Sequence, residues 1–296
     1  MALVLLNPHA QGGRAARLAG HIKAWLMAHA ADVAFAAPDS LEASLSLLLQ
    51  QPQGTRVVAV GGDGTLNRWL PALLQQHLVL GLVPLGSGND TARALGVYGQ
   101  PWQKALAHAL NAPCRPMDVG VALFDGQRVP FLSSFTAGFD SAVGKRALNG
   151  PKWLRGLPRY LWATLQELRH IQTWDLKVSI HDELCFAGRS LFASSLNTPT
   201  FGSGMPAAPQ GQIADGHLDV LHAGEFGCLG ALWMLPKLLN GTHLGHPKIQ
   251  LWPAQDLRIE SKQLLPIASD GEYLGTTHDL ALHVMPQALS VVMRGS

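Results

Sequence analysis

Residues 57–67, Val-Val-Ala-Val-Gly-Gly-Asp-Gly-Thr-Leu-Asn, constrain the fold of this chain more than any other segment. A short β-branched run that ends in glycine is typical of a buried parallel strand. The glycines allow a tight turn and a close approach of the backbone to a ligand. Thr65 then opens a predicted helix, whose N-terminus favours negative charge. Asp63 repels phosphate unless a divalent cation lies between them, so the segment indicates a metal–nucleotide site; a tight strand–helix turn with an incidental acid is the alternative.

Composition limits the classes of protein to consider. The 296 residues suffice for one large domain or two ordinary ones, and 47% hydrophobic with 14% charged residues indicate a soluble globular protein. A formal net charge of +2 argues against nucleic acid as a partner. The three cysteines are far apart and form no CxxC pair, which argues against a disulfide framework or a thiolate zinc site. No apolar run approaches the ~20 residues that span a bilayer, so we expect a cytoplasmic protein.

The first part of the chain alternates short apolar runs with helical patterns, which predicts a parallel α/β domain over residues 1–122. The predicted strands are 3–6, 56–60 and 78–84, and the predicted helices are 14–30, 40–50, 65–76, 91–95 and 102–110.

Strand-like runs dominate residues 123–287 and predict an antiparallel β-sandwich domain. These runs are 131–137, 176–180, 191–197, 218–222, 248–252, 257–261 and 280–285. Two helical patterns interrupt them, near 158–170 and 227–239, and Asp182-Glu183 marks a hairpin turn. The last segment, 288–296, can return to the first domain.

Three predicted strands of the first domain end in polar, glycine-rich loops, at 7–13, 61–65 and 86–90. The carboxyl ends of parallel strands lie along one edge of the sheet, where α/β proteins bind ligands. Loops at this edge would offer backbone N–H groups to phosphates. The sequence contains no P-loop, no GxGxxG after the first strand and no G-x-S-x-G, which argues against standard P-loop, dinucleotide and α/β-hydrolase sites.

Two of these loops carry a family resemblance. Residues 61–67, Gly-Gly-Asp-Gly-Thr-Leu-Asn, and 84–93, Pro-Leu-Gly-Ser-Gly-Asn-Asp-Thr-Ala-Arg, resemble the catalytic domain of the diacylglycerol kinase and sphingosine kinase superfamily. More narrowly, the chain is similar to the soluble bacterial lipid kinases of that group. The other matching motifs, in chain order, are 7–13, 117–120, 137–143, 209–219 and 269–272.

The resemblance implies a first domain like those of NAD kinases and 6-phosphofructokinases, a β-sandwich second domain, and an active site in the cleft between them. It implies ATP and magnesium as cofactors and a lipid alcohol such as diacylglycerol as acceptor. The residues implied to bind the nucleotide are Asn7, Pro8, His9, Ala10, Gln11, Gly62, Asp63, Gly64, Thr65, Leu66, Asn67, Arg68 and Ser87.

The same resemblance implies the catalytic residues Glu272, Asp63 and Asp270. Glu272 is the general base on the lipid hydroxyl, with Asp270 beside it. Asp63 organises magnesium and phosphates, with Asp118 as a supporting acid that acts through water. The ligands implied for a structural magnesium are Asp215, the carbonyl of His217, and Gln212, which offers only a neutral oxygen.

Two departures from the family pattern keep other functions open. Arg68 stands where glutamate is common, and His9-Ala10-Gln11 replace a small hydroxyl residue before glycine. Asp270-Gly-Glu272 alone also fits an ordinary hairpin turn. The alternatives are an NAD kinase, which shares Gly-Gly-Asp-Gly-Thr, and a catalytically silent nucleotide- or lipid-binding regulatory protein. The loop at 85–90 favours the lipid kinase.

Residues 145–174 combine six Lys and Arg with several Trp, Tyr and Leu side chains. A basic, aromatic-rich stretch suits the interface of an anionic membrane. The alternative is a connecting helix that packs on the sandwich and keeps its basic face in water. We therefore expect a cytoplasmic enzyme peripheral to the membrane, with no nucleic-acid partner; a homodimer is left open.

Overall fold

The apolar runs near the start of the chain form a parallel sheet. In the computed structural model, β1 (Ala2–Leu6) pairs with β2 (Ala34–Ala36) and β3 (Arg56–Gly61), and β3 pairs with β4 (Val79–Pro84). The last residues of β13 (Glu272–Val292) pair with the other side of β4, also in parallel. The side chains of β1, β3 and β4 are buried almost without a break, as in strands covered on both faces.

The structure describes residues 2–86, 88–151 and 153–294. Its contacts divide the chain into a first unit, Met1–Met117 with Gln287–Ser296, and a second unit, Asp118–Pro286. β5 (Cys114–Phe124) leads from the first unit to the second, and β13 leads back.

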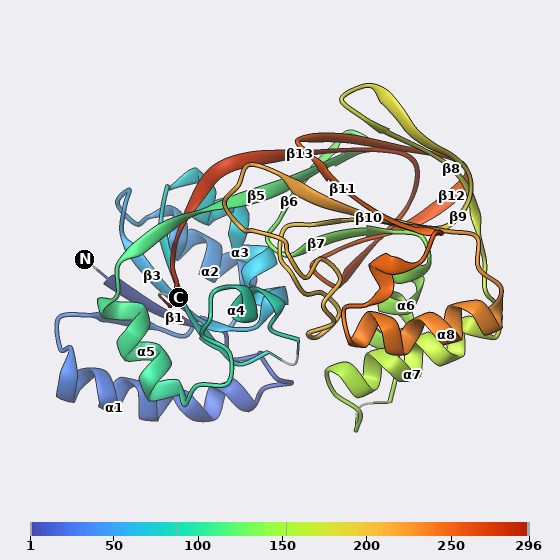
Figure 1. Ribbon diagram of the computed structural model, residues 1–296. Helices are drawn as coiled ribbons and strands as arrows, with labels where there is room; N and C mark the ends of the chain where they lie inside the picture. The colour runs from blue at the N-terminus through green and yellow to red at the C-terminus, as the bar shows by residue number, and fades with distance from the viewer. Residues whose placement is uncertain (1, 87, 152, 295–296) are drawn as a thin grey trace. The chain divides into compact units, whose positions relative to one another are not determined.

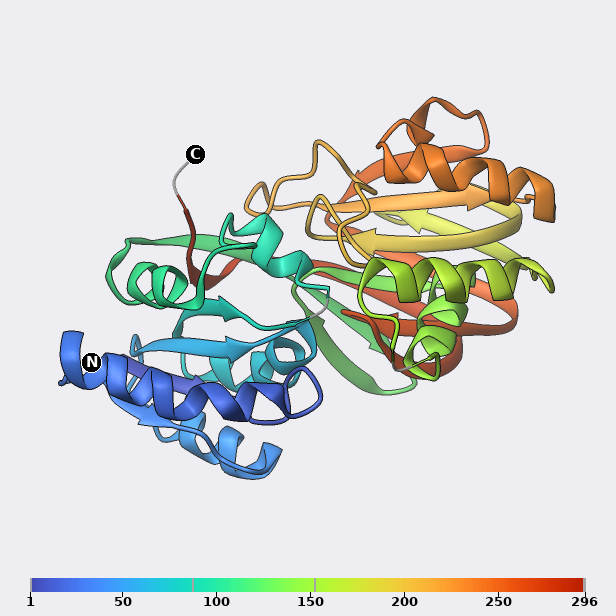
Figure 2. The same cartoon turned by 90° about the horizontal axis from the view of Figure 1, so that it is seen from below.

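Helices cover both faces of the first unit's sheet (Figures 1 and 2). They are η1 (Arg14–Leu18), α1 (Ala19–His29), α2 (Leu41–Leu49), α3 (Asp63–Gln75), α4 (Asp90–Ala94) and α5 (Trp102–Asn111). Ile22 of α1 and Leu106 of α5 belong to one apolar cluster with side chains of β1, β3 and β4. The helix predicted over 14–30 is correct only from Ala19, because its first turn is the 3₁₀ helix η1.

The second unit is built mainly from antiparallel strands. They are β6 (Gln127–Phe131), β7 (Ser134–Ala137), β8 (Trp174–Ile180), β9 (Glu183–Leu196), β10 (Leu218–Gly224), β11 (Ile249–Ala254) and β12 (Asp256–Ser269), with parts of β5 and β13. The hydrogen-bonded order runs β11, β10, β9, β7, β12, β13, and β8 joins both β9 and β12.

Three helices lie on one side of these strands: α6 (Phe139–Leu148), α7 (Leu157–Leu168) and α8 (Cys228–Leu239), followed by the short η2 (His243–Gly245) (Figures 1 and 2). They share one apolar core with the strands. The sequence indicated α7 and α8, but no helix was predicted at the position of α6.

Two local predictions were wrong for physical reasons. The strand predicted over 131–137 is broken between β6 and β7, because the N–H groups of Leu132, Ser133 and Ser134 donate to the carboxylate of Asp270 instead of a neighbouring strand. The hairpin turn between β8 and β9 is His181-Asp182, where both residues have positive φ, and Glu183 already belongs to β9. No helix in the described part of the chain could cross a membrane.

Candidate nucleotide and acceptor sites

The loops after β3 and β4 meet backbone to backbone. Gly62 follows β3 and Gly86 lies in the loop after β4, and a Cβ on Gly62 would lie 2.5 Å from the Cα of Gly86. The N–H of Leu85 also donates to the carbonyl of Gly61 at 2.7 Å. Only glycine allows this approach, and it leaves no side chain at either position between the backbone and a ligand.

Asp63 joins the same two loops from the start of α3. Its carboxylate accepts hydrogen bonds from the N–H groups of Asp90 at 3.1 Å and Thr91 at 3.3 Å, the first two residues of α4. A carboxylate in this position offsets the partial positive charge of a helix N-terminus. Asp63 therefore fixes the position of the loop after β4, besides any part it takes in holding magnesium.

Asn89 closes the loop after β4 and was not among the site residues expected from the sequence. It has a φ of 59°; its Oδ1 accepts from the N–H of Gly86 at 2.9 Å, and its Nδ2 donates to the carbonyl of Gly86 at 2.7 Å. Asparagine tolerates positive φ better than most residues. An asparagine directly before a helix, three residues after a glycine, was the available signal.

The loop after β1 is tied to α3 by side chains. The Nδ2 of Asn7 donates to Oγ1 of Thr65 at 2.7 Å, and Oδ1 of Asn7 accepts from the N–H of His9 at 3.0 Å. Gln11, Gly12 and Gly13 all have positive φ. The first unit thus brings together all three loops that the sequence placed at one sheet edge.

The expected nucleotide-binding residues differ in how they could contact a ligand. Thr65 and Leu66 are buried, so Leu66 could offer only its backbone, whereas the side chains of His9, Gln11 and Arg68 are exposed. The half-buried ones are Asn7, Pro8, Ala10, Gly62, Asp63, Gly64 and Asn67. Ser87 lies outside the described residues.

In the second unit, Asp270 and Gly271 form the two-residue turn between β12 and β13, with φ of 46° and 83°. The carboxylate of Asp270 accepts from Leu132 at 3.0 Å, Ser133 at 2.7 Å and Ser134 at 3.0 Å. Asp270 therefore anchors the break between β6 and β7. Glu272 is the first residue of β13, half-buried, and pairs with Ser269 in the hairpin register.

Asp118, at the start of the second unit, holds the loop that contains Gly216. Asp118 is fully buried, and its Oδ2 accepts from the N–H of Gly216 at 2.7 Å. Asp215 is exposed, and its Oδ1 accepts from the N–H of His217 at 3.0 Å. Burial raises the pKa of Asp219 to about 6, with the charge of Asp215 as the second cause.

No three His, Cys, Asp or Glu side chains gather as metal ligands in the described part of the chain. Gln212, the third residue expected at the structural magnesium, is exposed. The structural magnesium on Asp215, the carbonyl of His217 and Gln212 therefore stays a prediction, and we assign no step to it.

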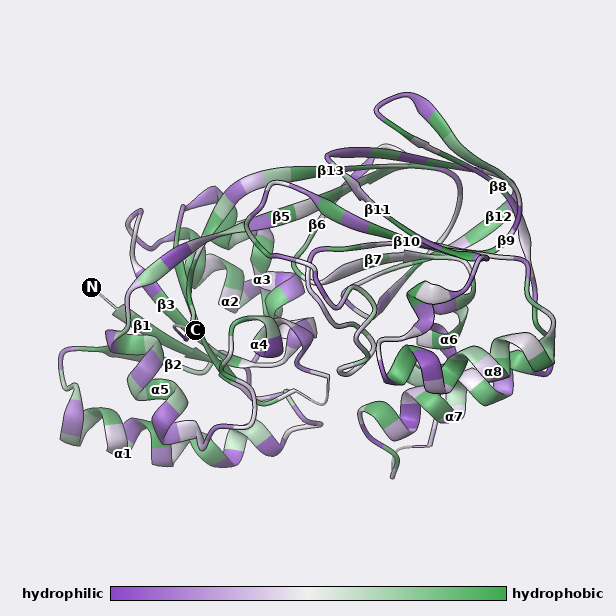
Figure 3. Ribbon diagram, viewed as in Figure 1, coloured by the Kyte–Doolittle hydropathy of each residue, from purple (hydrophilic) through white to green (hydrophobic). Residues whose placement is uncertain are grey.

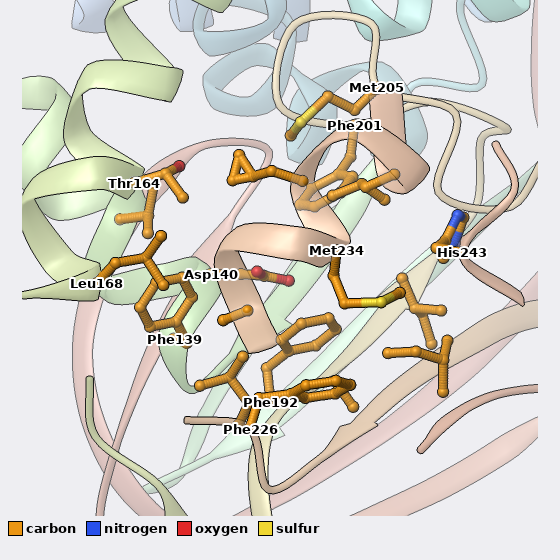
Figure 4. Close-up of a pocket in the computed structure, with 18 of the residues that line it drawn as sticks. Phe139, Asp140, Thr164, Leu168, Phe192, Phe201, Met205, Phe226, Met234 and His243 are labelled. Atoms are coloured by element: carbon orange, nitrogen blue, oxygen red, sulfur yellow. The ribbon is translucent and has the colours of Figure 1, made fainter. Parts of the chain in front are cut away.

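An apolar cavity of about 80 Å³ lies between the helices and strands of the second unit (Figure 4). Phenylalanine, leucine and methionine side chains supply most of its lining, including Phe139, Phe192 and Met234. The sequence did not reveal this cavity, because its lining residues come from segments between 139 and 249 that only the fold brings together.

Two titratable groups in the cavity wall are shifted towards their neutral forms. Burial raises the pKa of Asp140 to about 7, although a hydrogen bond from Ser194 at 3.0 Å opposes the shift. Burial also lowers the pKa of His243, whose Nε2 lies 3.0 Å from the carbonyl of Ala207. Since that carbonyl can only accept, Nε2 carries the proton of the neutral ring. Its buried Nδ1, which has no hydrogen-bond partner, is then an acceptor.

Two family models match this chain. The diacylglycerol kinase catalytic domain matches residues 1–122, and the YegS C-terminal NAD kinase beta sandwich-like domain matches residues 133–293. The chain belongs to the diacylglycerol kinase and YegS-like family of lipid kinases. The family expected from the sequence motifs is therefore confirmed.

Individual members of the family cover most of the chain. A diacylglycerol kinase of Mycobacterium tuberculosis is 26% identical over 291 residues, which cover 97% of this chain and 93% of the relative. A Pseudomonas putida protein named "Probable lipid kinase YegS-like" is 32% identical over 238 residues, which cover 79% of this chain and 76% of the relative.

Solved structures share the fold. A diacylglycerol kinase from Bacillus anthracis superposes with a TM-score of 0.71 at 19% identity, over 99% of this chain and 96% of that one. An NAD kinase from Archaeoglobus fulgidus superposes with a TM-score of 0.53 at 10% identity, over 99% of this chain and 93% of that one. The expected fold class, a parallel α/β domain and a β-sandwich domain, is confirmed.

Replacing Gly62 with alanine tests the contact between the two loops. Gly62→Ala places a methyl group against the backbone of Gly86, so we expect it to destabilise the first unit by about 1–3 kcal/mol. Gly20→Ala in α1 is the matched control, because nothing lies within 4 Å of its Cβ position and alanine favours a helix by roughly 0.5–1 kcal/mol. Denaturant unfolding should show a lower free energy of unfolding for Gly62→Ala and a higher one for Gly20→Ala. Changes of the same sign in both variants would contradict the contact.

The pH dependence of unfolding tests the environment of Asp140. Its pKa rises from 3.8 to about 7 on folding, so its stabilising contribution is complete below about pH 4 and is lost as the pH rises to about 7. Asp140→Asn should reduce this loss by a few kcal/mol, since one pKa unit corresponds to about 1.4 kcal/mol. Denaturant unfolding at about pH 4, 5.5 and 7, which spans this titration, measures the difference in the free energy of unfolding between the two proteins. If the free energy of unfolding changed with pH equally in the variant and in the unmodified chain, the result would contradict a buried, neutral Asp140.

Proposed function

We propose that this chain transfers the γ-phosphate of MgATP to the hydroxyl of a lipid alcohol such as diacylglycerol. The observation that carries the proposal is the junction of three glycine-rich or polar loops in the first unit of a lipid kinase family member, with Asp63 at its centre. Phosphoryl transfer requires mainly positioning and neutralisation of charge, which backbone amides and a metal-binding carboxylate supply.

The nucleotide half of the reaction belongs to the first unit. The loops after β1, β3 and β4 would contact the phosphates through backbone N–H groups. Magnesium arrives with ATP and prefers phosphate oxygens, water and one or two carboxylates, so Asp63 is the protein ligand we propose. Asp118, the first residue of the second unit, would act on the metal through water. The exposed cation of Arg68, on the same helix as Asp63, would add attraction for the phosphates.

The acceptor half belongs to the second unit. Glu272 would accept the proton of the lipid hydroxyl while its oxygen attacks the γ-phosphorus. A phosphorus–oxygen bond to the lipid forms, the bond from the γ-phosphorus to the bridging oxygen breaks, and ADP leaves. Asp270 acts through the backbone that it anchors, as a positioning residue for Glu272. Glu272 and Asp63 would both act on the transferred γ-phosphoryl group.

The apolar cavity supports a lipid as the acceptor. Its wall is almost wholly hydrocarbon, and an acyl or alkyl chain would gain about 0.8 kcal/mol for each methylene group that it buries there. Its volume of about 80 Å³ is smaller than the ~150 Å³ of an engineered cavity that binds benzene, so it takes only part of one chain unless its walls move. The acceptor itself would be met at a membrane surface.

Turnover of ATP with a panel of lipid alcohols tests the function, and Glu272→Gln tests the mechanism. We expect a phosphorylated lipid by mass, and a fall in kcat of about 10²–10⁴-fold in Glu272→Gln, because glutamine cannot accept the proton. Glu183→Gln, an exposed glutamate at the start of β9, is the matched control and should keep the rate of the unmodified chain.

Two outcomes would contradict the proposed function, and a third would contradict its mechanism. Phosphorylation of NAD in place of every lipid would favour the NAD kinase that shares the fold. Binding of ATP without turnover would favour a silent regulatory protein. Near-normal turnover by Glu272→Gln would remove the assigned base while leaving the kinase function standing.

A further inference from the structure

α8 carries apolar side chains on two opposite stripes, and the protein buries only one of them. The stripe that lines the cavity consists of Ala231, Met234, Leu235 and Leu238. The other stripe consists of Leu229, Leu232 and Trp233, which are 76%, 42% and 76% exposed. The whole helix is mainly hydrophobic along its length (Figure 3). A surface helix normally turns polar residues outward, so the outer stripe indicates a partner with an apolar surface.

Positive charge is concentrated in the sequence segments that contain α6, α7 and α8. Among the described residues, segments 139–151, 153–170 and 226–248, which contain α6, α7 and α8, hold seven Lys and Arg against two acidic residues; the other described residues hold fourteen against eighteen. Of the two acids, Asp140 is buried in the cavity wall and Glu167 pairs with Arg146. The partner that this charge attracts is therefore anionic.

We propose that the outer stripe of α8 docks on the surface of an anionic phospholipid bilayer. Leucine and tryptophan on one side of a helix, with lysine and arginine around it, is the composition of helices that lie in the headgroup region. Because the opposite stripe of α8 lines the apolar cavity, the docked helix would separate that cavity from the bilayer by its own width. This proposal rests on the lipid kinase function proposed above.

The docking element differs from the segment that the sequence indicated. In 145–174, Trp174 is only 6% exposed and donates to the carbonyl of Leu264 at 3.1 Å, and Tyr160 packs edge-on against Phe201 at 6.2 Å. Trp153 and Leu165 are exposed, at 81% and 48%. That segment therefore supplies charge and a few exposed apolar side chains, whereas α8 supplies three exposed apolar side chains on one stripe.

A second copy of this chain is a poorer occupant. In a symmetric dimer the same patch meets itself, so the positive helices of both copies would face one another. Like charges brought together across an interface oppose association. An anionic bilayer has the opposite charge and an apolar interior, and so matches both features of the patch.

Vesicle binding tests the proposal. The unmodified chain should sediment with vesicles that contain phosphatidylglycerol, weakly with phosphatidylcholine alone, and less as salt is raised. Leu229→Ser combined with Trp233→Ser should weaken binding by about tenfold or more, because two apolar side chains no longer enter the interface. Leu184→Ser, at a residue 62% exposed on β9, is the matched control and should bind as the unmodified chain does.

Two cysteines provide a direct reading of which surface enters the bilayer. Cys228 opens α8 and Cys185 lies on β9, and both are exposed. With the other cysteines replaced by serine, an environment-sensitive fluorophore on Cys228 should shift to the blue on phosphatidylglycerol vesicles, and the same fluorophore on Cys185 should not.

Equal binding by the double variant, or a shift at Cys185 alone, would overturn the proposal. If the unmodified chain were a dimer and the double variant a monomer, with vesicle binding unchanged, the stripe would be assigned to contact with a second copy instead. Phosphorylation of a water-dispersed short-chain lipid alcohol, measured on the same double variant, should be unchanged. Loss of vesicle binding with turnover intact thus separates this proposal from the kinase function.

Discussion

The pair of hydrogen bonds from the first two amides of α4 to the carboxylate of Asp63 is the constraint on which the proposed nucleotide site depends. It fixes the loop after β4 against the loop after β3, where two glycines leave no space for side chains. Asn7 adds the loop after β1 through Thr65. Three segments far apart in sequence thereby offer backbone amides in one region, and a carboxylate that can share a metal ion with phosphate lies among them.

The sequence predicted this half well because its signals are local. Each buried strand is a continuous apolar run, and each loop is marked by glycine or asparagine directly after the run. The positions of Gly62 and Asp63 follow from the turn that they make. Asn89 was missed because its part, closing a loop on Gly86, depends on a positive φ that several residue types can adopt.

The second half was less predictable because its features depend on contacts between distant residues. Asp270 breaks a strand more than a hundred residues earlier in the chain, which no local pattern signals. Asp140 belongs to a motif noted in the sequence, yet its raised pKa comes from apolar neighbours that the fold supplies. The two stripes of α8 differ only in what covers them, so hydropathy alone could not tell the cavity wall from the exposed surface.

The central claim is that Asp63 of the first unit and Glu272 of the second act on the same phosphoryl group. A double-mutant cycle on kcat, with Asp63→Asn, Glu272→Gln and the combined variant, tests it most directly. Residues that act as a unit show strongly non-additive losses, so the combined variant should be about as slow as the slower single variant. Losses that multiply across the two substitutions would mean that the acids act independently, and would contradict the claim.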